Sequence, residues 1–245
     1  MPGDYIAEAG TSTTDRQCAP CGADETTTAS NWTRCVPTYV DVAAGPNHVC
    51  GIRASDGFAT CWGRISSKPP AEVAFDAITS GHSYTCGIRS GDKHVVCWGS
   101  NDAVATAPEG VAFDAISAGS HHACGVRSDD GNVQCWGSSV LGETSDAPVD
   151  VPFDAVAAGY SVSCGIRSSD GEAVCWGAEI DDMPTGVAFD AISLSRLYSR
   201  YACGIRRSDH ALVCWGGDGS AVTDFPACHH RRRGVPLSPR SPVPR

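Results

Sequence analysis

The chain of 245 residues lacks several features that would point directly to a function. No apolar run approaches the ~18 residues that a membrane-spanning helix needs. The first residues, Met1-Pro-Gly-Asp-Tyr-Ile6, do not form a signal peptide. The serine-nucleophile, phosphate-loop and His-Glu-x-x-His zinc motifs are also missing. Nothing therefore argues for a membrane span or an enzyme, and we expect no catalytic residue and no cofactor.

Positive charge is scarce outside the C-terminal end. The formal net charge is −10, yet the last fifteen residues hold five arginines and no acid, which leaves −15 for the rest of the chain. An acidic body is unsuited to a primary nucleic-acid surface, since phosphates are bound through lysine and arginine. We therefore expect no nucleic-acid partner.

Cysteine, by contrast, is abundant: the chain has fourteen. Ten of them form five pairs with members eleven residues apart, and Trp-Gly follows the second member of each pair. The pairs are Cys50 and Cys61, Cys86 and Cys97, Cys124 and Cys135, Cys164 and Cys175, and Cys203 and Cys214; the tryptophans are Trp62, Trp98, Trp136, Trp176 and Trp215.

The third copy of this unit has the pattern of a β-hairpin. If Cys124 lies opposite Cys135, then Val126 lies opposite Val133, and Ser128-Asp-Asp-Gly131 forms the loop. Asp and Gly favour such loops, and the alternation of side chains along a strand places both cysteines on one face with the valines. Opposed residues of an antiparallel pair have Cα atoms about 4.5–5.5 Å apart, which a disulfide can bridge. We expect a disulfide in each hairpin.

The other face of the same hairpin carries Gly125, Arg127 and Trp136. Trp136 lies diagonal to Gly125 in this register, so its ring can cover a position without a side chain, and we interpret the five tryptophans as packing anchors. The recurring arginines either bond to carbonyls of a neighbouring unit or are solvated. Histidines recur near the first cysteine of three units, where packing or turn bonding is more plausible than catalysis; they are His48, His82 and His121 or His122.

Zinc is the main rival to the disulfide interpretation. Cys18 and Cys21 form one C-x-x-C motif, which Cys35 or Cys228-His229-His230 could complete. A single motif without a second at matched spacing is weak support, and we expect no metal site. Regular pairing across hairpins instead indicates an oxidising compartment.

The units repeat with spacings of 36 to 40 residues between their first cysteines. Each unit opens with an apolar stretch such as Val111-Ala-Phe-Asp-Ala-Ile116, followed by an Ala-Gly turn and the hairpin. Three strands are evident in each unit. A period near 40 residues in an all-β sequence indicates a β-propeller, here with five visible blades.

These units resemble the repeat of the regulator of chromosome condensation family (RCC1-like repeats). In the third unit the matching residues are Ala118-Gly119, His121 or His122, Asp130-Gly131 and Trp136-Gly137, and the resemblance spans residues 38–217. It implies a β-propeller. In being short and cysteine-paired, the units look more like bacterial secreted repeats, the propeller-type β-lactamase inhibitor and the ectodomains of plant Crinkly-type receptor kinases. Family propellers commonly have seven blades, so the chain is either a fragment or a five-bladed ring closed by its own ends.

The two ends differ from the repeats and define three regions. Residues 1–37 form a cysteine-rich segment that resembles small modules of the tumour-necrosis-factor-receptor or ephrin-receptor type. Residues 38–228 hold the propeller repeats. Residues 229–245 are rich in proline and arginine and are expected to be disordered.

From these observations we predict a non-enzymatic binding scaffold that is extracellular or at the cell surface, with an upstream segment not included in this sequence. Its partner would be a protein or a glycan, held by the variable loops 64–72, 99–110, 138–149 and 177–186. One alternative is an intracellular guanine-nucleotide-exchange or ubiquitin-ligase-associated domain. Another is a secreted enzyme inhibitor.

Overall fold

The structure is a computed structural model that describes residues 4–8, 17–20, 25–27, 35–100, 106–196 and 200–216, with side chains from residue 37 onward. Its elements in these ranges are β-strands, and no helix there could span a membrane. Four short strands form two antiparallel pairs ahead of the repeats: β1 (Asp4–Glu8) with β2 (Gln17–Pro20), and β3 (Glu25–Thr27) with β4 (Cys35–Pro37).

The repeats form five blades, each a three-stranded antiparallel sheet whose strands follow chain order. The blades are β5 (Tyr39–Ala44), β6 (His48–Arg53) and β7 (Ala59–Gly63); β8 (Phe75–Ser80), β9 (Tyr84–Arg89) and β10 (Val95–Gly99); β11 (Phe113–Ala118), β12 (His122–Arg127) and β13 (Val133–Gly137); β14 (Phe153–Ala158), β15 (Val162–Arg167) and β16 (Ala173–Gly177); and β17 (Phe189–Leu194), β18 (Tyr201–Arg206) and β19 (Leu212–Gly216).

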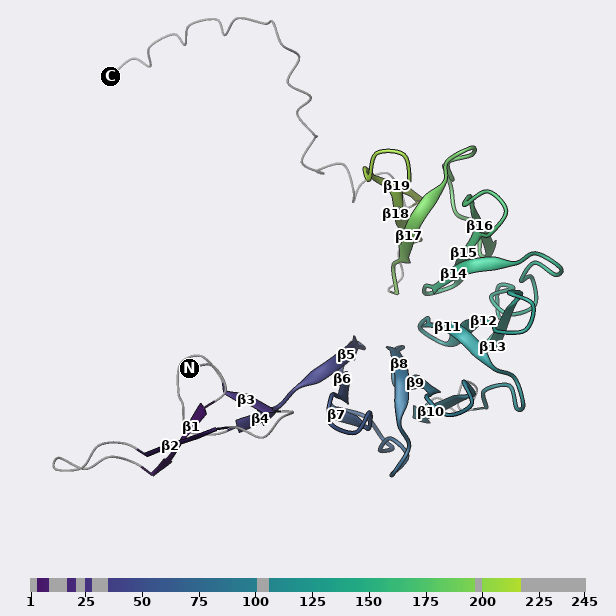
Figure 1. The fold of residues 1–245 in the computed structure, drawn as a ribbon. Coiled ribbons are helices and arrows are strands. Elements are labelled where there is room, and N and C mark those ends of the chain that lie inside the picture. Colours follow the sequence, from purple (N-terminus) through teal and green to yellow (C-terminus); the bar gives the residue numbers. More distant parts are fainter. Residues whose placement is uncertain are drawn as a thin grey trace, which may run out of the picture.

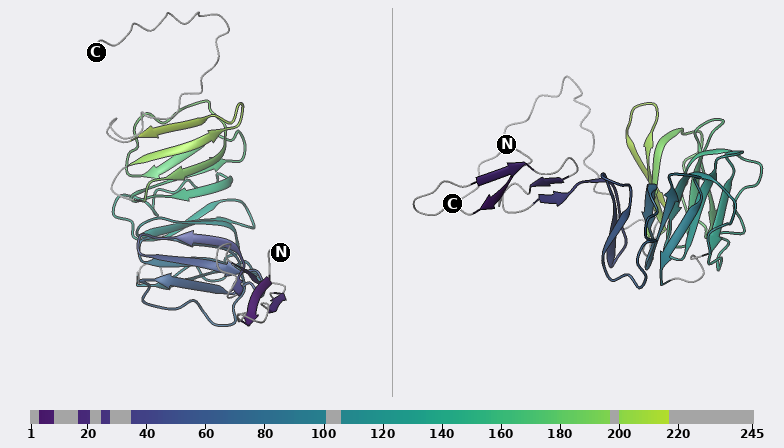
Figure 2. Two further views of the ribbon diagram at one scale, coloured as in Figure 1. Left: turned by 90° about the vertical axis from the view of Figure 1, so that its left-hand side faces the viewer. Right: turned by 60° about the horizontal axis from the view of Figure 1, so that its bottom comes forward.

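The five blades lie in an arc around a common axis, with the first strand of each blade innermost (Figure 1). The blades that contain β5 and β17 form the two ends of the arc (Figure 1). Turned on its side, the molecule shows the blades stacked one after another, with β1–β4 extending away from the first blade (Figure 2). The all-β propeller predicted from the repeats is confirmed.

The hairpin register is as predicted. Cys124 lies opposite Cys135 and Val126 opposite Val133, while the amide of Arg127 donates to the Asn132 carbonyl at 2.9 Å. The same register in every blade brings the paired Cα atoms to 4.0–4.1 Å, and all five pairs are disulfides. The pairing that the spacing predicted is therefore confirmed.

Each blade has two unlike faces. In the third blade the disulfide face carries Cys124, Val126 and Val133, and the aromatic face carries Phe113 and Trp136. A bulge between Phe113 and Ala115 reverses the alternation of the first strand, and this is why the phenylalanine shares a face with the tryptophan. The other blades repeat the bulge at the same place.

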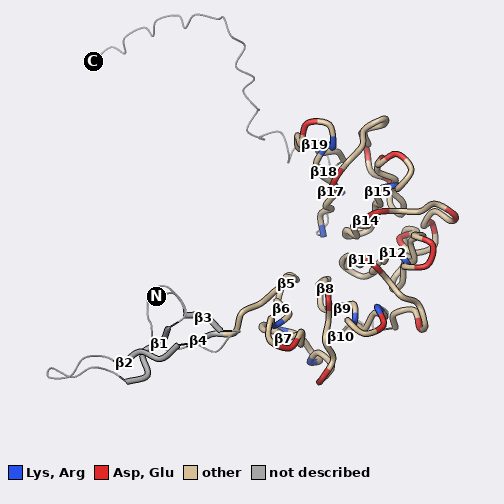
Figure 3. The backbone as a smooth tube through the Cα atoms, viewed as in Figure 1, with Lys and Arg blue, Asp and Glu red and all other residues tan. Residues whose placement is uncertain are grey.

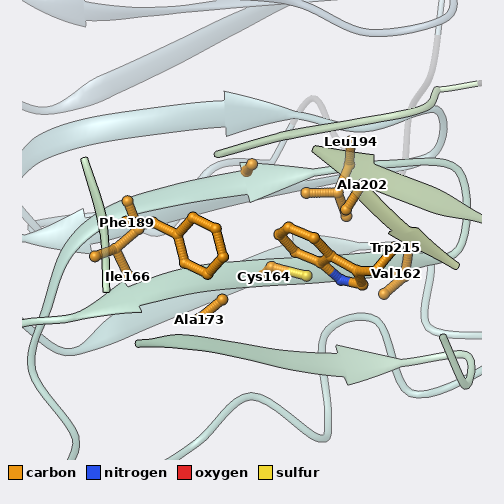
Figure 4. Close-up of a cluster of buried hydrophobic side chains, with 9 residues drawn as sticks. Val162, Cys164, Ile166, Ala173, Phe189, Leu194, Ala202 and Trp215 are labelled. Atoms are coloured by element: carbon orange, nitrogen blue, oxygen red, sulfur yellow. The ribbon is translucent and has the colours of Figure 1, made fainter. Parts of the chain in front are cut away.

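The hydrophobic core lies between blades because the disulfide face of one blade packs against the aromatic face of the next. Figure 4 shows this for the last interface, where Phe189 and Trp215 of the fifth blade lie over Cys164 and Ile166 of the fourth. The three preceding interfaces have equivalent buried clusters. Each blade therefore depends on its neighbours for burial.

The ring that covers the hairpin glycine differs from the expectation. A Cβ atom on Gly125 would lie 2.4 Å from Cδ1 of Phe113, so this phenylalanine, and not Trp136, occupies the space above the glycine. Trp136 packs beside the phenylalanine, with ring centroids 5.6 Å apart. Four of the five tryptophans are buried, whereas Trp62 in the first blade is exposed.

The two settings of tryptophan give a direct test of where the core lies. We expect Trp136→Ala to lower the free energy of unfolding by about 3–5 kcal/mol, because it empties a blade interface. Trp62→Ala should cost less than ~1 kcal/mol, since that ring is exposed and no described blade covers it. Urea unfolding followed by circular dichroism measures both; equal losses would contradict a core built between blades.

Candidate binding surface

The turns between the first and second strands of the blades meet around the axis. They form one surface, which we call the turn face: residues 45–47, 81–83, 119–121, 159–161 and 195–196. Adjacent turns are joined by backbone hydrogen bonds, from the Ser120 amide to the Gly159 carbonyl (2.9 Å) and from the Tyr160 amide to the Ser195 carbonyl (3.0 Å). The turns are thus held by each other as well as by their own strands.

Glycine is required where neighbouring turns touch. A Cβ atom on Gly119 would lie 2.3 Å from the Gly159 carbonyl oxygen, and one on Gly45 would lie 2.5 Å from the Gly81 carbonyl oxygen. Backbone therefore packs directly on backbone from blade to blade. This explains the Ala-Gly turn that the sequence repeats, and it gives the turn face a fixed frame.

A layer of buried polar groups lies just beneath these turns. The His48 imidazole bonds to the Thr85 hydroxyl at 2.9 Å, and His122 bonds to Ser163 at 2.7 Å. Both contacts cross a blade interface. Tyr84 takes the equivalent place in the second blade, where its hydroxyl can donate to the carbonyl oxygen of His122 at 2.5 Å.

The recurring histidines therefore fall into two classes, which the sequence pattern did not separate. His48 and His122 begin a middle strand and are buried. His82 and His121 lie in the turns and are exposed. The packing role expected for the group holds only for the first class.

Burial lowers the pKa of His122 to about 4, and the charge of His121 adds to this effect. The carboxylate of Glu143 opposes it. Glu143 is itself buried and accepts a hydrogen bond from the Leu141 amide at 2.8 Å. His122 is consequently neutral at pH 7. The sequence pattern gave no indication of Glu143, which lies in a connection between blades.

Arg196 links the fifth blade to the far end of the arc. Its Nη1 donates to the carbonyl oxygens of Ser80 at 2.8 Å and Ala44 at 3.3 Å, in the second and first blades. The Ser120 hydroxyl in turn donates to the Arg196 carbonyl. Burial lowers the pKa of this guanidinium. The Arg196 side chain thus bonds to both the first and the second blade. No local sequence pattern predicts this role.

Three aromatic rings follow one another across the exposed side of the turn face. The His82 and His121 rings have centroids 6.0 Å apart, and His121 and Tyr160 follow at 6.1 Å. No Asp or Glu occurs in the residues of the turn face, although acids outnumber bases in the chain. The surface therefore differs in charge from most of the molecule.

The opposite end of the blades carries the hairpin loops, whose charges are paired locally. In the fifth blade, Arg206 bonds to Asp209 at 2.6 Å, and the Asp209 carboxylate also accepts from the Ala211 amide. These two contacts lower the pKa of Asp209 to about 2. The arginines of the other blades make the same kind of pair: Arg53 with Asp56, Arg89 with Asp92, Arg127 with Asp129 and Asp130, and Arg167 with Asp170.

Neither role considered for these arginines, bonding to a neighbouring carbonyl or free solvation, is therefore correct. Acidic residues are visible at these outer loops in Figure 3. Asp129 and Asp130 both form ion pairs with Arg127, so their carboxylates are neutralised by an arginine of the same hairpin.

The connections between blades start at the turn-face end and return to the hairpin end. They also serve the packing: Trp176 Nε1 donates to the Glu143 carbonyl at 3.1 Å, and the Gly99 amide donates to the Ser67 hydroxyl at 2.6 Å. These variable segments are thus partly structural. The connection 138–149 nevertheless exposes Val140 and Leu141.

In the part of the chain with described side chains, no group of three or more His, Cys, Asp or Glu residues is placed to hold a metal ion. The side chains of Cys18, Cys21, Cys35 and Cys228 lie outside that part, as does the tail 229–245. The resemblance of residues 1–37 to small receptor modules concerns side chains that are likewise outside it.

Comparison with known proteins agrees with this architecture. Residues 113–143 match the model of the regulator of chromosome condensation (RCC1) repeat. No protein with curated function matches the sequence. Yeast RCC1 (Prp20), in a structure bound to Kap60, is similar in fold: TM-score 0.50 and 18% identity over 76% of this chain and 57% of that chain.

Two plant ectodomains are more similar in sequence. The entire ectodomain of the Physcomitrella patens receptor kinase CR4 has a TM-score of 0.66 and 28% identity over 82% of this chain. The CRINKLY WD40 ectodomain of the Arabidopsis thaliana receptor kinase ACR4 has a TM-score of 0.64 and 28% identity over 82% of this chain and 72% of its own length. The match covers 56% of the CR4 ectodomain, little more than half.

The buried histidine gives a pH-dependent prediction. The unfolded chain protonates His122 below about pH 6.5, whereas the folded chain resists protonation down to about pH 4. Stability contributed by the neutral ring is therefore present above pH 6.5 and is lost as the pH falls, by about 3 kcal/mol at pH 4. His48, whose pKa burial also lowers, acts in the same direction.

The double variant His122→Val, Ser163→Ala copies the next interface, where Val162 and Ala202 occupy the same positions. We expect it to remove most of this loss between pH 6.5 and 4, as measured by urea unfolding at several pH values. The loss below pH 4, to which the hairpin-loop aspartates contribute, should remain in both proteins. An unchanged slope above pH 4 would show that His122 is not the group responsible.

Proposed function

We propose that these five disulfide-closed, RCC1-like blades form a non-enzymatic extracellular scaffold whose turn face binds a protein partner. The observation that carries this proposal is the row of rings His82, His121 and Tyr160, which stands on interlocked backbone turns. A fixed frame reduces the conformational entropy lost on binding. Aromatic side chains are the residues that most often anchor protein interfaces.

The chemistry of the turn face indicates the kind of partner. It offers imidazole and phenol groups with no carboxylate of its own, so an acidic or aromatic segment suits it better than a basic one. The planes of the His121 and Tyr160 rings are inclined by 72°, which gives no flat platform for a sugar. We therefore favour a protein partner over a glycan.

The cysteines support the proposed compartment. Disulfides form and persist in oxidising environments and are rare in the cytosol. Five of them, together with the similarity to two plant receptor ectodomains, favour an extracellular setting over an intracellular exchange-factor role. The likeness to yeast RCC1 concerns the fold and carries no function to this chain.

Selection of a displayed random peptide library against the full chain tests the binding surface. We expect the recovered peptides to be enriched in acidic and aromatic residues and to lose binding to the His121→Asp variant, since the new carboxylate repels them. The matched control is Ser90→Asp, which adds the same charge to an exposed hairpin loop. If the recovered peptides lose binding to Ser90→Asp but still bind His121→Asp, they bind at the hairpin loops, and the turn face is not the binding surface.

The compartment has its own test. Peptide mapping without reduction, on protein isolated from its native source, should find all five hairpin pairs linked. If those ten thiols are free, the extracellular proposal fails, and screening against intracellular GTPases becomes the appropriate next step.

A further inference from the structure

Two exposed histidines of the turn face have no polar partner in the described part of the chain. His82 and His121 lie in adjacent turns, and their rings have centroids 6.0 Å apart with planes inclined by 33°. Neither imidazole forms a hydrogen bond or an ion pair with a described residue. We call these two residues the histidine pair. Their ring nitrogens face no acceptor or donor that the described blades provide.

The other described histidines are each engaged within the chain. His48 and His122 are buried and bond to hydroxyl groups of the next blade. His94 and His210 lie in hairpin loops, where an aspartate oxygen is 3.5 Å from the Nδ1 atom of each. Packing, hydrogen bonding or a nearby carboxylate thus explains these residues, but it does not explain the histidine pair.

The neighbouring turns bring no acid to the histidine pair. The turns 45–47 and 159–161 carry no charged side chain, and the nearest of their rings is that of Tyr160, 6.1 Å from His121. The turn 195–196 contributes a cation, Arg196, whose guanidinium donates to two backbone carbonyls. The described turns around the pair therefore favour a negative group and offer none.

The connections that leave the blades at this end add few charges. The one after the first blade begins with Arg64, and the one after the third contains Glu143 and Asp146. The Glu143 carboxylate is buried and acts on His122, while Asp146 accepts a hydrogen bond from Ser145 at 2.8 Å. Neither carboxylate, and no other acid among the described residues, is bonded to the histidine pair.

We propose that the histidine pair binds one carboxylate of the partner protein and that mild acidification strengthens this binding. The inference rests on the proposed function of the turn face. Histidine changes its charge between pH 5 and 8. Protonated imidazoles donate charge-assisted hydrogen bonds of about 2.7–2.9 Å to carboxylates. The two oxygens of one carboxylate can therefore each accept from one ring of a pair at this separation.

Protonation and carboxylate binding promote each other at such a site. Two protonated imidazoles side by side repel each other, and an anion bound to both removes that repulsion. Binding consequently takes up protons, and acidification raises the affinity by the same linkage. The affinity gained in this way is present at low pH and is lost as the pH rises and the rings become neutral.

The frame beneath the histidine pair persists over the same pH interval. Burial lowers the pKa of His122 to about 4, so the ring remains neutral and bonded to Ser163 at pH 5.5. The exposed histidines and the buried layer therefore respond to different pH values. Binding strengthens first, and the turn face loses stability only at lower pH.

Fluorescence anisotropy of a labelled peptide, four glutamates around one tryptophan, measures the effect with the full chain between pH 8 and 5.5. Glutamate has a pKa of about 4.3, so the peptide stays ionised throughout and any trend arises in the protein. We expect the dissociation constant to fall by about tenfold or more on acidification, since hydrogen bonds to charged groups are the stronger ones. The double variant His82→Asn, His121→Asn should bind with little pH dependence, because asparagine keeps a polar group that does not titrate.

His210→Asn is the matched control. It removes an exposed histidine from a hairpin loop, and asparagine tolerates the positive φ of 56° at that position. This variant should keep the full pH response. The single variants of the histidine pair, each expected to lose part of the response, replace the double variant if circular dichroism shows that it does not fold.

The outcomes separate this proposal from the function on which it rests. Peptide binding that is equally tight at pH 8 and 5.5 overturns the carboxylate site and leaves the turn face as a protein-binding surface. So does a pH response that survives in the double variant or disappears in His210→Asn. Absence of peptide binding at every pH overturns both proposals.

Discussion

The structure depends on the contact between a hairpin disulfide and the phenylalanine–tryptophan pair of the following blade. A single three-stranded sheet is too small to bury its own apolar face, so burial comes from stacking. The disulfide contributes in two ways. It constrains the unfolded hairpin, which stabilises the fold by about 3 kcal/mol in the chain-entropy model. It also provides part of the apolar surface against which the aromatic rings pack.

The hairpins could be predicted because their information is local. Cysteines eleven residues apart, apolar residues inside them and an Asp-Gly turn admit one register, and the structure has it. The covering of Gly125 could not be predicted in the same way. It depends on the bulge after Phe113, which reverses the alternation of a strand whose sequence shows no irregularity.

The turn face could not be predicted from the sequence for a different reason: its residues come from separate blades. His121 and His122 are adjacent in the chain, yet one is exposed and the other is buried against Ser163 of the next blade. Arg196 bonds to a carbonyl 116 residues away. Periodicity predicts that such positions recur around an axis, but it does not say which side chain of each turn lies outward.

The order of the faces along the arc also makes the disulfides unequal toward a chemical reductant. In the first four blades the first cysteine of each pair is fully buried under the blade that follows, whereas the second is only partly covered; the buried ones are Cys50, Cys86, Cys124 and Cys164. The fifth blade has no described successor, and both of its cysteines, Cys203 and Cys214, are only partly covered. Thiolate attack needs access to a sulfur atom, so cleavage would begin in the fifth blade. Once that blade loosens, the disulfide of the fourth blade loses its cover. Loss of the oxidised fold would therefore travel from the fifth blade toward the first, one hairpin at a time.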